Sequence, residues 1–294
     1  TTTATVTEGG SIVYTATTSN PGTGSALAVT LSNGQTITIP VGQSSANSAP
    51  WAVRGDDAYA QGTQTLNVTA TGTTGGNFEA VTRSGTATTT VTDDADATTV
   101  TITASAATVT EGGSITYTAS VNNAVTGTPL AITLSNGQVI TIPVGQSSAT
   151  GAAFAVRADD AYVQGTQTLN VGITGTSGGG YEALTTTSTA TTTVTDDADA
   201  TTVTISTTTA TVTEGGSIVY TATTSNPVTG SALVVTLSNG QTITIPVGQS
   251  SANSAPFAVR ADDAYAQGTQ TLNVTAAGTT GGNFEAVTRS GTAT

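Results

Sequence analysis

The sequence has no cysteine, histidine, lysine or methionine. Without cysteine and histidine there is no thiolate or imidazole to serve as a nucleophile, a general base or a zinc ligand. The absence of cysteine also excludes disulfides, so a secreted protein of this size depends for its stability on buried cores or on bound metal. These absences exclude most kinds of active site, and we expect a protein that is not an enzyme.

Charged residues are scarce as well, and most of them are acidic. Five arginines stand against 18 aspartates and glutamates, which gives a formal net charge of −13 at pH 7. Such a chain has no basic surface for nucleic acid or for anionic lipid. It also has no run of about 18 apolar residues, so we expect no direct insertion into a membrane.

The sequence does contain one unit of about 100 residues, repeated three times. Glu8, Glu111 and Glu214 recur at intervals of 103 residues. This period is too long for a solenoid repeat and fits an independent domain. We expect the first repeat to lack its first strand and the third to lack its C-terminal acidic cluster, as in a piece cut from a longer array. The predicted repeats, called the first, second and third copies below, are residues 1–96, 97–199 and 200–294.

Apolar residues alternate with polar ones in every segment of a copy, which predicts strands. On one strand the alternation directs Ile37, Ile39 and Val41 inward. Gly42–Pro50 is predicted to be a loop, and the last strand is predicted to be long and to end at Val91. Seven such strands in about 100 residues are typical of an immunoglobulin-like sandwich. We therefore predict an all-β fold of three tandem seven-stranded immunoglobulin-like β-sandwich domains in an elongated rod. A closed barrel of the same strands is the second choice.

All the acidic residues fall on the 103-residue grid. Strands of a sandwich run alternately up and down, so the parity of a loop gives the pole at which it lies. Parity places six of the seven acids of a full copy at its C-terminal pole, next to the following copy. The seventh acid, Glu79 in the first copy and Glu182 and Glu285 in the others, is predicted to lie at the opposite pole, outside the cluster.

We predict that this acidic cluster binds Ca²⁺. Crowded carboxylates repel one another, and Ca²⁺ accepts six to eight oxygen ligands in a flexible geometry, whereas Mg²⁺ demands a near-ideal octahedron. Backbone carbonyls of Asn122–Gly127 or Gly178–Gly180 in the next copy would complete the ligand set. The predicted ligands are Glu8, Asp56, Asp57, Asp93, Asp94, Asp96, Glu111, Asp159, Asp160, Asp196, Asp197, Asp199, Glu214, Asp262 and Asp263.

Charge balance allows up to about three Ca²⁺ per pole, and we expect one or two. The third copy keeps Glu214, Asp262 and Asp263 without a terminal cluster, so its pole is predicted to hold fewer ions or none. The alternative to metal binding is that Asp-rich loops only favour turns and solubility.

An arginine precedes each internal Asp pair and a tyrosine follows it. We predict that the arginine, Arg54 in the first copy, braces the loop by a salt bridge. We predict that the tyrosine, Tyr59 in the first copy, braces its own domain in the manner of a tyrosine corner. The equivalent residues are Arg157 and Arg260, and Tyr162 and Tyr265.

Several motifs resemble those of a Calx-β-type sandwich, in which an opening Glu, an internal Asp pair and a C-terminal acidic run bind calcium at one pole. The motifs are Val6-Thr7-Glu8-Gly9-Gly10, the run from Phe154 to Asp160, the run from Gln164 to Leu169, and Asp196-Asp197. Carried onto the first copy, the family's ligands are Glu8, Asp56, Asp57, Asp93, Asp94 and Asp96. The near-identical, Thr-rich, Lys-free tandem units more closely resemble the extender repeats of giant RTX adhesins of Gram-negative bacteria.

The resemblance to RTX adhesins implies a function. In these proteins immunoglobulin-like domains bind Ca²⁺ at their linkers, and the array holds an adhesive tip away from the cell. The resemblance implies an extracellular protein of the bacterial cell surface, secreted by the type I route and active in attachment or biofilm formation. Its expected partners are Ca²⁺ and the neighbouring repeats of the same chain, in a monomeric rod.

Two other kinds of protein stay open. The chain would be a ligand-binding module for glycan or protein if it had an exposed aromatic cluster on a loop, which the sequence does not show. It would be an ice-binding surface if Thr-x-Thr runs such as Thr99–Thr103 formed a flat lattice, which the twisted strands of a sandwich do not offer.

Overall fold

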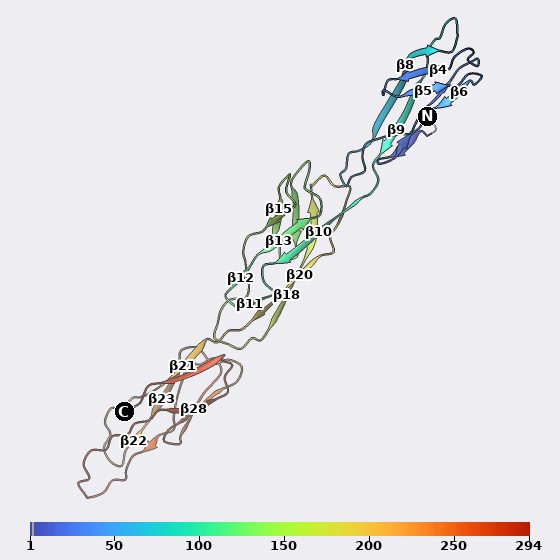
Figure 1. Ribbon diagram of the computed structural model, residues 1–294. Helices are drawn as coiled ribbons and strands as arrows, with labels where there is room; N and C mark the ends of the chain where they lie inside the picture. The colour runs from blue at the N-terminus through green and yellow to red at the C-terminus, as the bar shows by residue number, and fades with distance from the viewer. Residues whose placement is uncertain (2) are drawn as a thin grey trace. The chain divides into compact units, whose positions relative to one another are not determined.

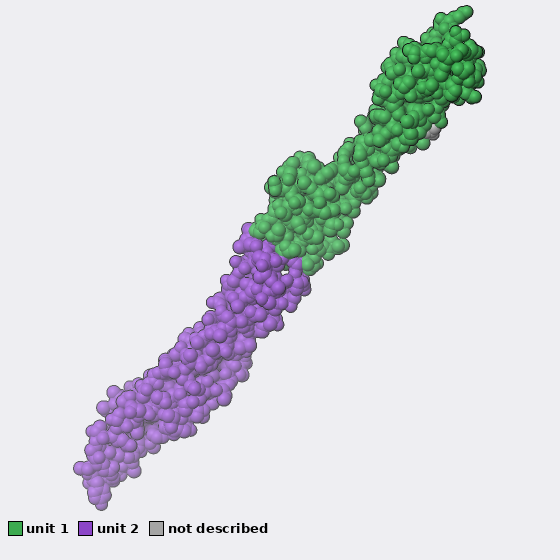
Figure 2. Space-filling model, in the orientation of Figure 1, with its two compact units in different colours: residues 1–103, 118–151, 171–189 green, residues 104–117, 152–170, 190–294 purple. Residues whose placement is uncertain are grey.

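The computed structural model describes residue 1 and residues 3–294. Every regular element in these residues is a β-strand, so the all-β prediction is confirmed. The described residues therefore include no helix that is long and apolar enough to cross a membrane. The chain divides into two compact units, residues 1–103, 118–151 and 171–189, and residues 104–117, 152–170 and 190–294 (Figure 2). The division passes through the second copy, so each junction between consecutive copies lies within one unit.

The first copy, in the first unit, has a five-stranded sheet in the order β1-β9-β8-β4-β5 and two short strand pairs, β2 with β7 and β3 with β6 (Figure 1). Ile12 on β2 and Tyr14, which lies between β2 and β3, pack with Leu27, Ile37 and Ile39 on the sheet in one buried core. The strands are β1 (Thr5–Thr7), β2 (Ser11–Ile12), β3 (Thr15–Thr17), β4 (Leu27–Leu31), β5 (Thr36–Ile39), β6 (Ser45–Asn47), β7 (Trp51–Ala52), β8 (Gln64–Gly75) and β9 (Thr86–Thr92).

The second copy repeats these pairings. In the first unit it has a sheet in the order β16-β13-β10-β19, and β14 pairs antiparallel with β15 and β18. In the second unit β11 pairs with β20, and β12 pairs with β17. The strands are β10 (Ala97–Ala104), β11 (Thr108–Thr110), β12 (Ser114–Ile115), β13 (Tyr117–Val121), β14 (Leu130–Leu134), β15 (Val139–Ile142), β16 (Ser148–Thr150), β17 (Phe154–Ala155), β18 (Gln167–Ser177), β19 (Ala183–Thr185) and β20 (Thr189–Thr195).

The third copy, in the second unit, shows the two layers of the sandwich most completely. The sheets β26-β23-β21-β29 and β25-β24-β28 enclose a core that includes Val203 and Tyr220 from the first sheet and Leu233 and Ile243 from the second. Two sheets around one core confirm the predicted immunoglobulin-like sandwich. The strands are β21 (Ala200–Thr207), β22 (Ser217–Ile218), β23 (Tyr220–Thr224), β24 (Leu233–Leu237), β25 (Thr242–Ile245), β26 (Ser251–Asn253), β27 (Phe257–Ala258), β28 (Ala276–Thr280) and β29 (Ala286–Ser290).

Parallel strand pairs close the C-terminal poles of the first two copies. β1 and β9 run parallel with Thr7 opposite Thr92. β11 and β20 run parallel with Thr110 opposite Thr195. Two parallel strands reach the same edge of a sheet together. The residues that follow them therefore leave the sheet side by side.

A second kind of parallel pair opens the following copy. β10 and β19 run parallel with Ala97 opposite Ala183, and β21 and β29 run parallel with Ala200 opposite Ala286. The residues that precede these strands therefore enter the copy side by side. Each acidic linker, residues 93–96 and 196–199, runs from the end of one parallel pair to the beginning of another.

Three details of the predicted strands were wrong. Val41 is 53% exposed, because β5 ends at Ile39 before Pro40, which has no backbone N–H for a ladder hydrogen bond. The predicted loop Gly42–Pro50 contains β6, which pairs with β3. The predicted long last strand is two strands in the second copy, because β19 pairs with β10 and β20 pairs with β11.

Candidate metal centres at the junctions

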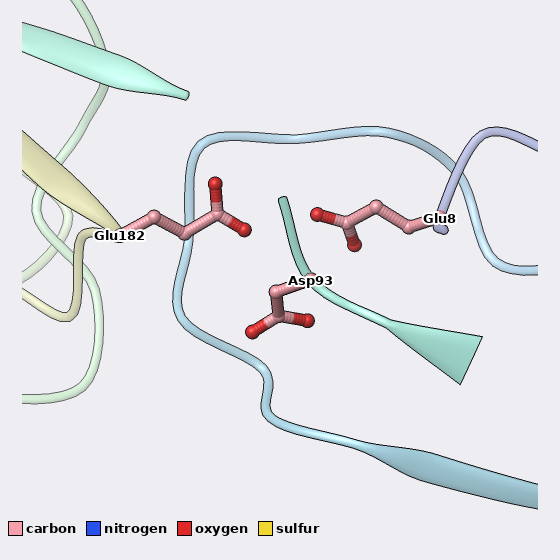
Figure 3. A group of neighbouring side chains, drawn as sticks. All are labelled: Glu8, Asp93 and Glu182. Atoms are coloured by element: carbon pink, nitrogen blue, oxygen red, sulfur yellow. The ribbon is translucent and has the colours of Figure 1, made fainter. Parts of the chain in front are cut away.

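The first junction gathers carboxylates from both copies that it joins. Glu8 follows β1 and Asp93 follows β9, so the parallel pair brings them to one edge. Glu182 precedes β19 of the second copy, and its Oε2 accepts a 2.8 Å hydrogen bond from the backbone N–H of Asp96. Figure 3 shows Glu8 and Glu182 reaching toward each other, with Asp93 beside the gap between them. One oxygen of each lies within 4.8 Å of the other two, and we call these three residues the cross-copy trio.

Glu8 belongs to a second group, the single-copy trio, with Asp56 and Asp94. One oxygen of each again lies within 4.8 Å of the others. Gly9 allows the Asp56 loop to come so close, because a Cβ at Gly9 would lie only 2.9 Å from Cβ of Asp56, and φ of Gly9 is +70°. The two trios share Glu8, so they describe two adjacent positions for a ligand.

The guanidinium of Arg54 holds two of these carboxylates in place. Its Nε lies 3.0 Å from Oε2 of Glu8, and its Nη2 donates to Oδ1 of Asp93. Oδ2 of Asp93 accepts hydrogen bonds from the backbone N–H groups of Gln61 at 2.8 Å and Gly62 at 2.6 Å. The predicted salt-bridge brace is confirmed, and it ties the loop after β7 to the acidic linker.

Glu8 is buried, with 4% of its surface exposed. Among the described residues, Oε1 of Glu8 and Oε1 of Glu182 have no hydrogen-bond partner. Burial raises the pKa of the Glu8 carboxyl, and the Glu182 carboxyl adds to the rise, although Arg54 opposes it. A buried carboxylate oxygen without a partner is strongly unfavourable. The site therefore favours a proton or a cation next to Glu8.

Mutual repulsion extends through the rest of the junction. Asp94, and after it Asp96, raises the pKa of the Asp56 carboxyl. The junction contains seven carboxylates and one guanidinium, that of Arg54, which leaves six formal negative charges, the charge of three divalent cations. The seven are Glu8, Asp56, Asp57, Asp93, Asp94, Asp96 and Glu182.

The second junction repeats this arrangement in the second unit. Arg157 donates from Nε to Oε2 of Glu111 at 2.9 Å and from Nη2 to Asp196. Glu111 is 3% exposed, and Oε1 of Glu111 and of Glu285 lack a hydrogen-bond partner in the part of the chain that the structure describes. The cross-copy trio is Glu111, Asp196 and Glu285, and the single-copy trio is Glu111, Asp159 and Asp197.

The pKa shifts at the second junction have the same causes. Burial raises the pKa of the Glu285 carboxyl, and the neighbouring Glu111 carboxyl raises it further. Asp159, and after it Asp197, raises the pKa of the Asp199 carboxyl. Both junctions therefore combine burial with like charge.

The C-terminal pole of the third copy lacks such a cluster. Arg260 reaches Oε2 of Glu214 at 3.3 Å, but the side chain of Glu214 is 25% exposed, against 0% for Glu8. Within residues 3–294, no three carboxylates of this pole approach one another as closely as those of a trio. The equivalent Glu, Asp and Arg residues therefore form a cluster at the two poles that also have linker acids and a following copy.

The predicted ligands fall into two groups. The trios contain Glu8, Asp56, Asp93, Asp94, Glu111, Asp159, Asp196 and Asp197. The structure does not bring Asp57, Asp96, Asp160, Asp199, Glu214, Asp262 or Asp263 into a trio. Asp57 instead fixes its own loop, because Oδ1 accepts a 2.8 Å hydrogen bond from the N–H of Tyr59 and Oδ2 is bonded by the side chain of Gln61.

Glu182 and Glu285 were missed, since the sequence interpretation placed them outside the cluster. Parity put each at the pole opposite its own copy's acids, and that pole meets the acids of the preceding copy. Their places on the 103-residue grid were the available signal. Glu79, which has the same place in the first copy, is exposed.

The predicted role of Tyr59 and Tyr162 was wrong, because they brace the neighbouring copy and not their own domain. The Tyr59 hydroxyl donates to the carbonyl of Ala124 in the second copy at 2.7 Å, and its ring stacks on Tyr181. The Tyr162 hydroxyl donates to the carbonyl of Pro227 in the third copy at 2.9 Å.

The trios fit a divalent cation that prefers oxygen ligands. Ca²⁺–oxygen distances of about 2.3–2.6 Å place two opposite ligands roughly 4.6–5.2 Å apart, and the oxygens of each trio lie within 4.8 Å. A cation there would also provide a partner for the buried Oε1 of Glu8.

One test uses the close approach of a glycine to the Asp159 loop. At Gly112, φ is +69° and an added Cβ would lie 2.8 Å from Cβ of Asp159; at Gly137, φ is +85° and nothing lies within 4 Å. Both Gly→Ala substitutions should cost about 1–2 kcal/mol of stability from backbone strain. Only Gly112→Ala should displace Asp159 and weaken Ca²⁺ binding, measured by calorimetric titration. Equal Ca²⁺ affinities for the two variants would contradict the single-copy trio.

A second test is the pH dependence of stability without divalent cations. The raised pKa values of Glu8, Asp56, Asp199 and Glu285 mean that the folded state binds these protons more tightly than the unfolded state. Stability should therefore rise as pH falls through the folded-state values, with the gain complete below the ordinary values of 4.5 and 3.8. We expect the melting temperature to rise as the pH is lowered from about 7 toward these ordinary values. A lower melting temperature at the more acidic pH would contradict this account.

Comparison with known proteins identifies the family to which the three copies are similar. The family model of the LapA domain matches residues 1–94, 96–197 and 199–294. No curated protein matches the sequence. Among solved structures, the chain is similar to the Escherichia coli adhesin FdeC (18% identity, TM-score 0.27), with 96% of this chain and 91% of that chain covered. It is also similar to a tetra-tandem repeat in the extending region of a large adhesion protein (19% identity, TM-score 0.32), with 86% of this chain and 65% of that chain covered.

The three family matches are consecutive and together span almost the entire sequence. The chain therefore belongs to the LapA domain family, an adhesin family, and carries three copies of that domain in tandem.

Proposed function

We propose that the chain is an extender segment of a cell-surface adhesin and that Ca²⁺ bound at its junctions stiffens it. The observation that carries the proposal is the cross-copy trio. Glu8 and Asp93 of one copy and Glu182 of the next place oxygens within 4.8 Å of one another, and Oε1 of Glu8 is buried without a partner among the described residues. A cation bound there has ligands from both copies, so its binding energy depends on their relative position.

Two cations per junction fit the geometry best. The two trios share Glu8, so its carboxylate would contact both ions. Two divalent ions would neutralise four of the six formal negative charges at the first junction. Ca²⁺ is favoured over Mg²⁺ because the acidic ligands come from separate loops and two copies, which suits a flexible coordination shell better than a strict octahedron.

The ion would stabilise both the fold and the junction. A ligand that binds only the folded state adds about 2.7 kcal/mol of stability for each site when its free concentration is a hundred times Kd. Unfolding of either copy, or rotation of one copy against the other, would separate Glu182 from Glu8 and Asp93. Bound Ca²⁺ therefore opposes both motions.

Membership of an adhesin family supports a place outside the cell or at its surface. Three similar copies without cysteine, histidine or lysine suit a spacer better than a site for chemistry. We propose that such an array, exported by the type I route, holds an adhesive tip away from the bacterium for attachment or biofilm formation.

The proposal is tested by removing the carboxylate that only the following copy supplies. Glu182→Gln keeps the size of the side chain but removes a charged ligand, so Ca²⁺ affinity at the first junction should fall by about tenfold or more. The matched control is Glu79→Gln, the same change at the same place in the first copy, where the side chain is exposed. Titration calorimetry in the intact chain measures both variants. The proposal fails if Glu182→Gln binds Ca²⁺ as tightly as Glu79→Gln does.

A further inference from the structure

Each junction carries a second contact that involves no carboxylate side chain. In the first junction, residues 58–60 lie antiparallel to residues 180–182 of the next copy, with a β-bridge between Tyr59 and Tyr181. The N–H of Ala60 donates to the carbonyl of Gly180 at 2.9 Å, and the N–H of Glu182 donates to the carbonyl of Ala58 at 3.2 Å. The loop of one copy thus adds a short strand-like ladder to the next.

Aromatic rings reinforce this ladder. The rings of Tyr59 and Tyr181 stack with centroids 5.6 Å apart and planes inclined by 24°, an arrangement typical of favourable aromatic pairs. Tyr181 is backed by Gly179, where an added Cβ would lie 2.8 Å from two ring carbons. The Tyr59 hydroxyl also donates to the carbonyl of Ala124 at 2.7 Å. The contact therefore combines backbone hydrogen bonds, a ring stack and a side-chain hydrogen bond.

The second junction repeats the contact with different residues. Tyr162 forms the bridge with Phe284, and the two rings lie 5.7 Å apart at 27°. The N–H of Val163 donates to the carbonyl of Asn283 at 3.0 Å, and the N–H of Glu285 donates to the carbonyl of Ala161 at 3.1 Å. The same geometry with Phe in place of Tyr shows that the aromatic face is the common feature.

The loop takes its shape without help from the partner copy. In the third copy the N–H of Tyr265 donates to Oδ1 of Asp263 at 2.7 Å, the same turn that Asp57 and Asp160 form. Tyr265 is nevertheless 77% exposed, because no ring of another copy lies against it in the described residues. The loop is therefore formed in advance, and the partner segment covers its tyrosine.

We infer that this contact is a cation-independent clasp: the loop Ala58–Ala60 binds a Gly-Gly-x-aromatic-Glu segment of the following copy and positions that segment's glutamate for the metal centre. The clasp holds the backbone N–H of Glu182, the residue whose carboxylate enters the cross-copy trio. Tyr59 and Tyr181 are thus positioning residues. The existence of the clasp is independent of Ca²⁺, whereas its effect on the metal centre rests on the proposed function.

Hydrogen–deuterium exchange of the whole chain in EDTA tests the clasp itself. The amide of Glu182 reports on the first junction and the amide of Val163 on the second. Both residues lie in the second copy, and the sequence around each occurs only once in the chain, so each gives an unambiguous peptide. Both should be protected without Ca²⁺. Tyr59→Ala should reduce the protection of the Glu182 amide by about tenfold or more, while Tyr59→Phe, which keeps the ring, should retain most of it.

Tyr265→Ala is the matched control, because it removes the same side chain from the same turn without a partner ring. It should leave the protection of both amides unchanged. Exchange of the wild-type Glu182 amide in EDTA at the rate of an exposed loop amide would overturn the clasp. Unchanged protection in Tyr59→Ala would overturn the role of the ring stack.

Calcium titration tests the positioning role separately. Tyr59→Ala should lower Ca²⁺ affinity at the first junction several-fold without changing the number of ions bound, and Tyr59→Phe should restore most of the affinity. An unchanged affinity in Tyr59→Ala would overturn the positioning role. If the wild-type chain binds no Ca²⁺, the proposed function fails, while exchange in EDTA still decides whether the clasp exists.

Discussion

Crowding of like charge at two short linkers is the constraint on which the structure of the junctions depends. One parallel strand pair ends at each linker and another begins there, so acids from both copies converge. At each junction seven carboxylates accompany a single arginine. Burial of Glu8 and Glu111 prevents water from relieving this repulsion fully. A bound cation would relieve this repulsion and would also join the two copies.

The clasp and the proposed metal centre would have different tasks. A ladder of two backbone hydrogen bonds with one ring stack would hold two copies in contact but leave a hinge, because so few contacts resist rotation. Cations bound to the cross-copy trio would add a second connection from Glu182 to Glu8 and Asp93. Together with the covalent linker, the two connections would restrict rotation, and the proposed function would then make the stiffness of the junction depend on the Ca²⁺ concentration.

Much of this could be predicted from the sequence. The alternation of apolar residues predicted the all-β sandwich, the 103-residue grid identified the acids, and the parity of the loops predicted the pole where most of them meet. The alternation of apolar residues does not show where a proline ends a strand. Val41 was therefore predicted to point inward although it lies beyond the end of β5 and is exposed. β19 and β20 were predicted as one strand, because nothing in the continuous Thr-rich sequence shows where the chain passes from one sheet to the other.

The errors at the site arose from treating each copy alone. Glu182 and Tyr59 act on the neighbouring copy, and periodicity within one domain does not show which surfaces of two domains meet. Asp57 looked equivalent to Asp56 in sequence, yet it forms the turn that presents Tyr59, because one position in the loop changes the direction of the side chain. Because each linker is short, the C-terminal pole of one copy must contact the opposite pole of the next copy, and this predicts which side chains of the two copies meet.

The central claim, that cations at the junctions stiffen the array, is tested most directly by small-angle scattering of the chain in Ca²⁺ and then in EDTA, with melting temperatures measured on the same samples. We expect EDTA to reduce the maximum dimension and the melting temperature, and restored Ca²⁺ to reverse both changes. A maximum dimension and a melting temperature that stay the same in Ca²⁺ and in EDTA would contradict the account.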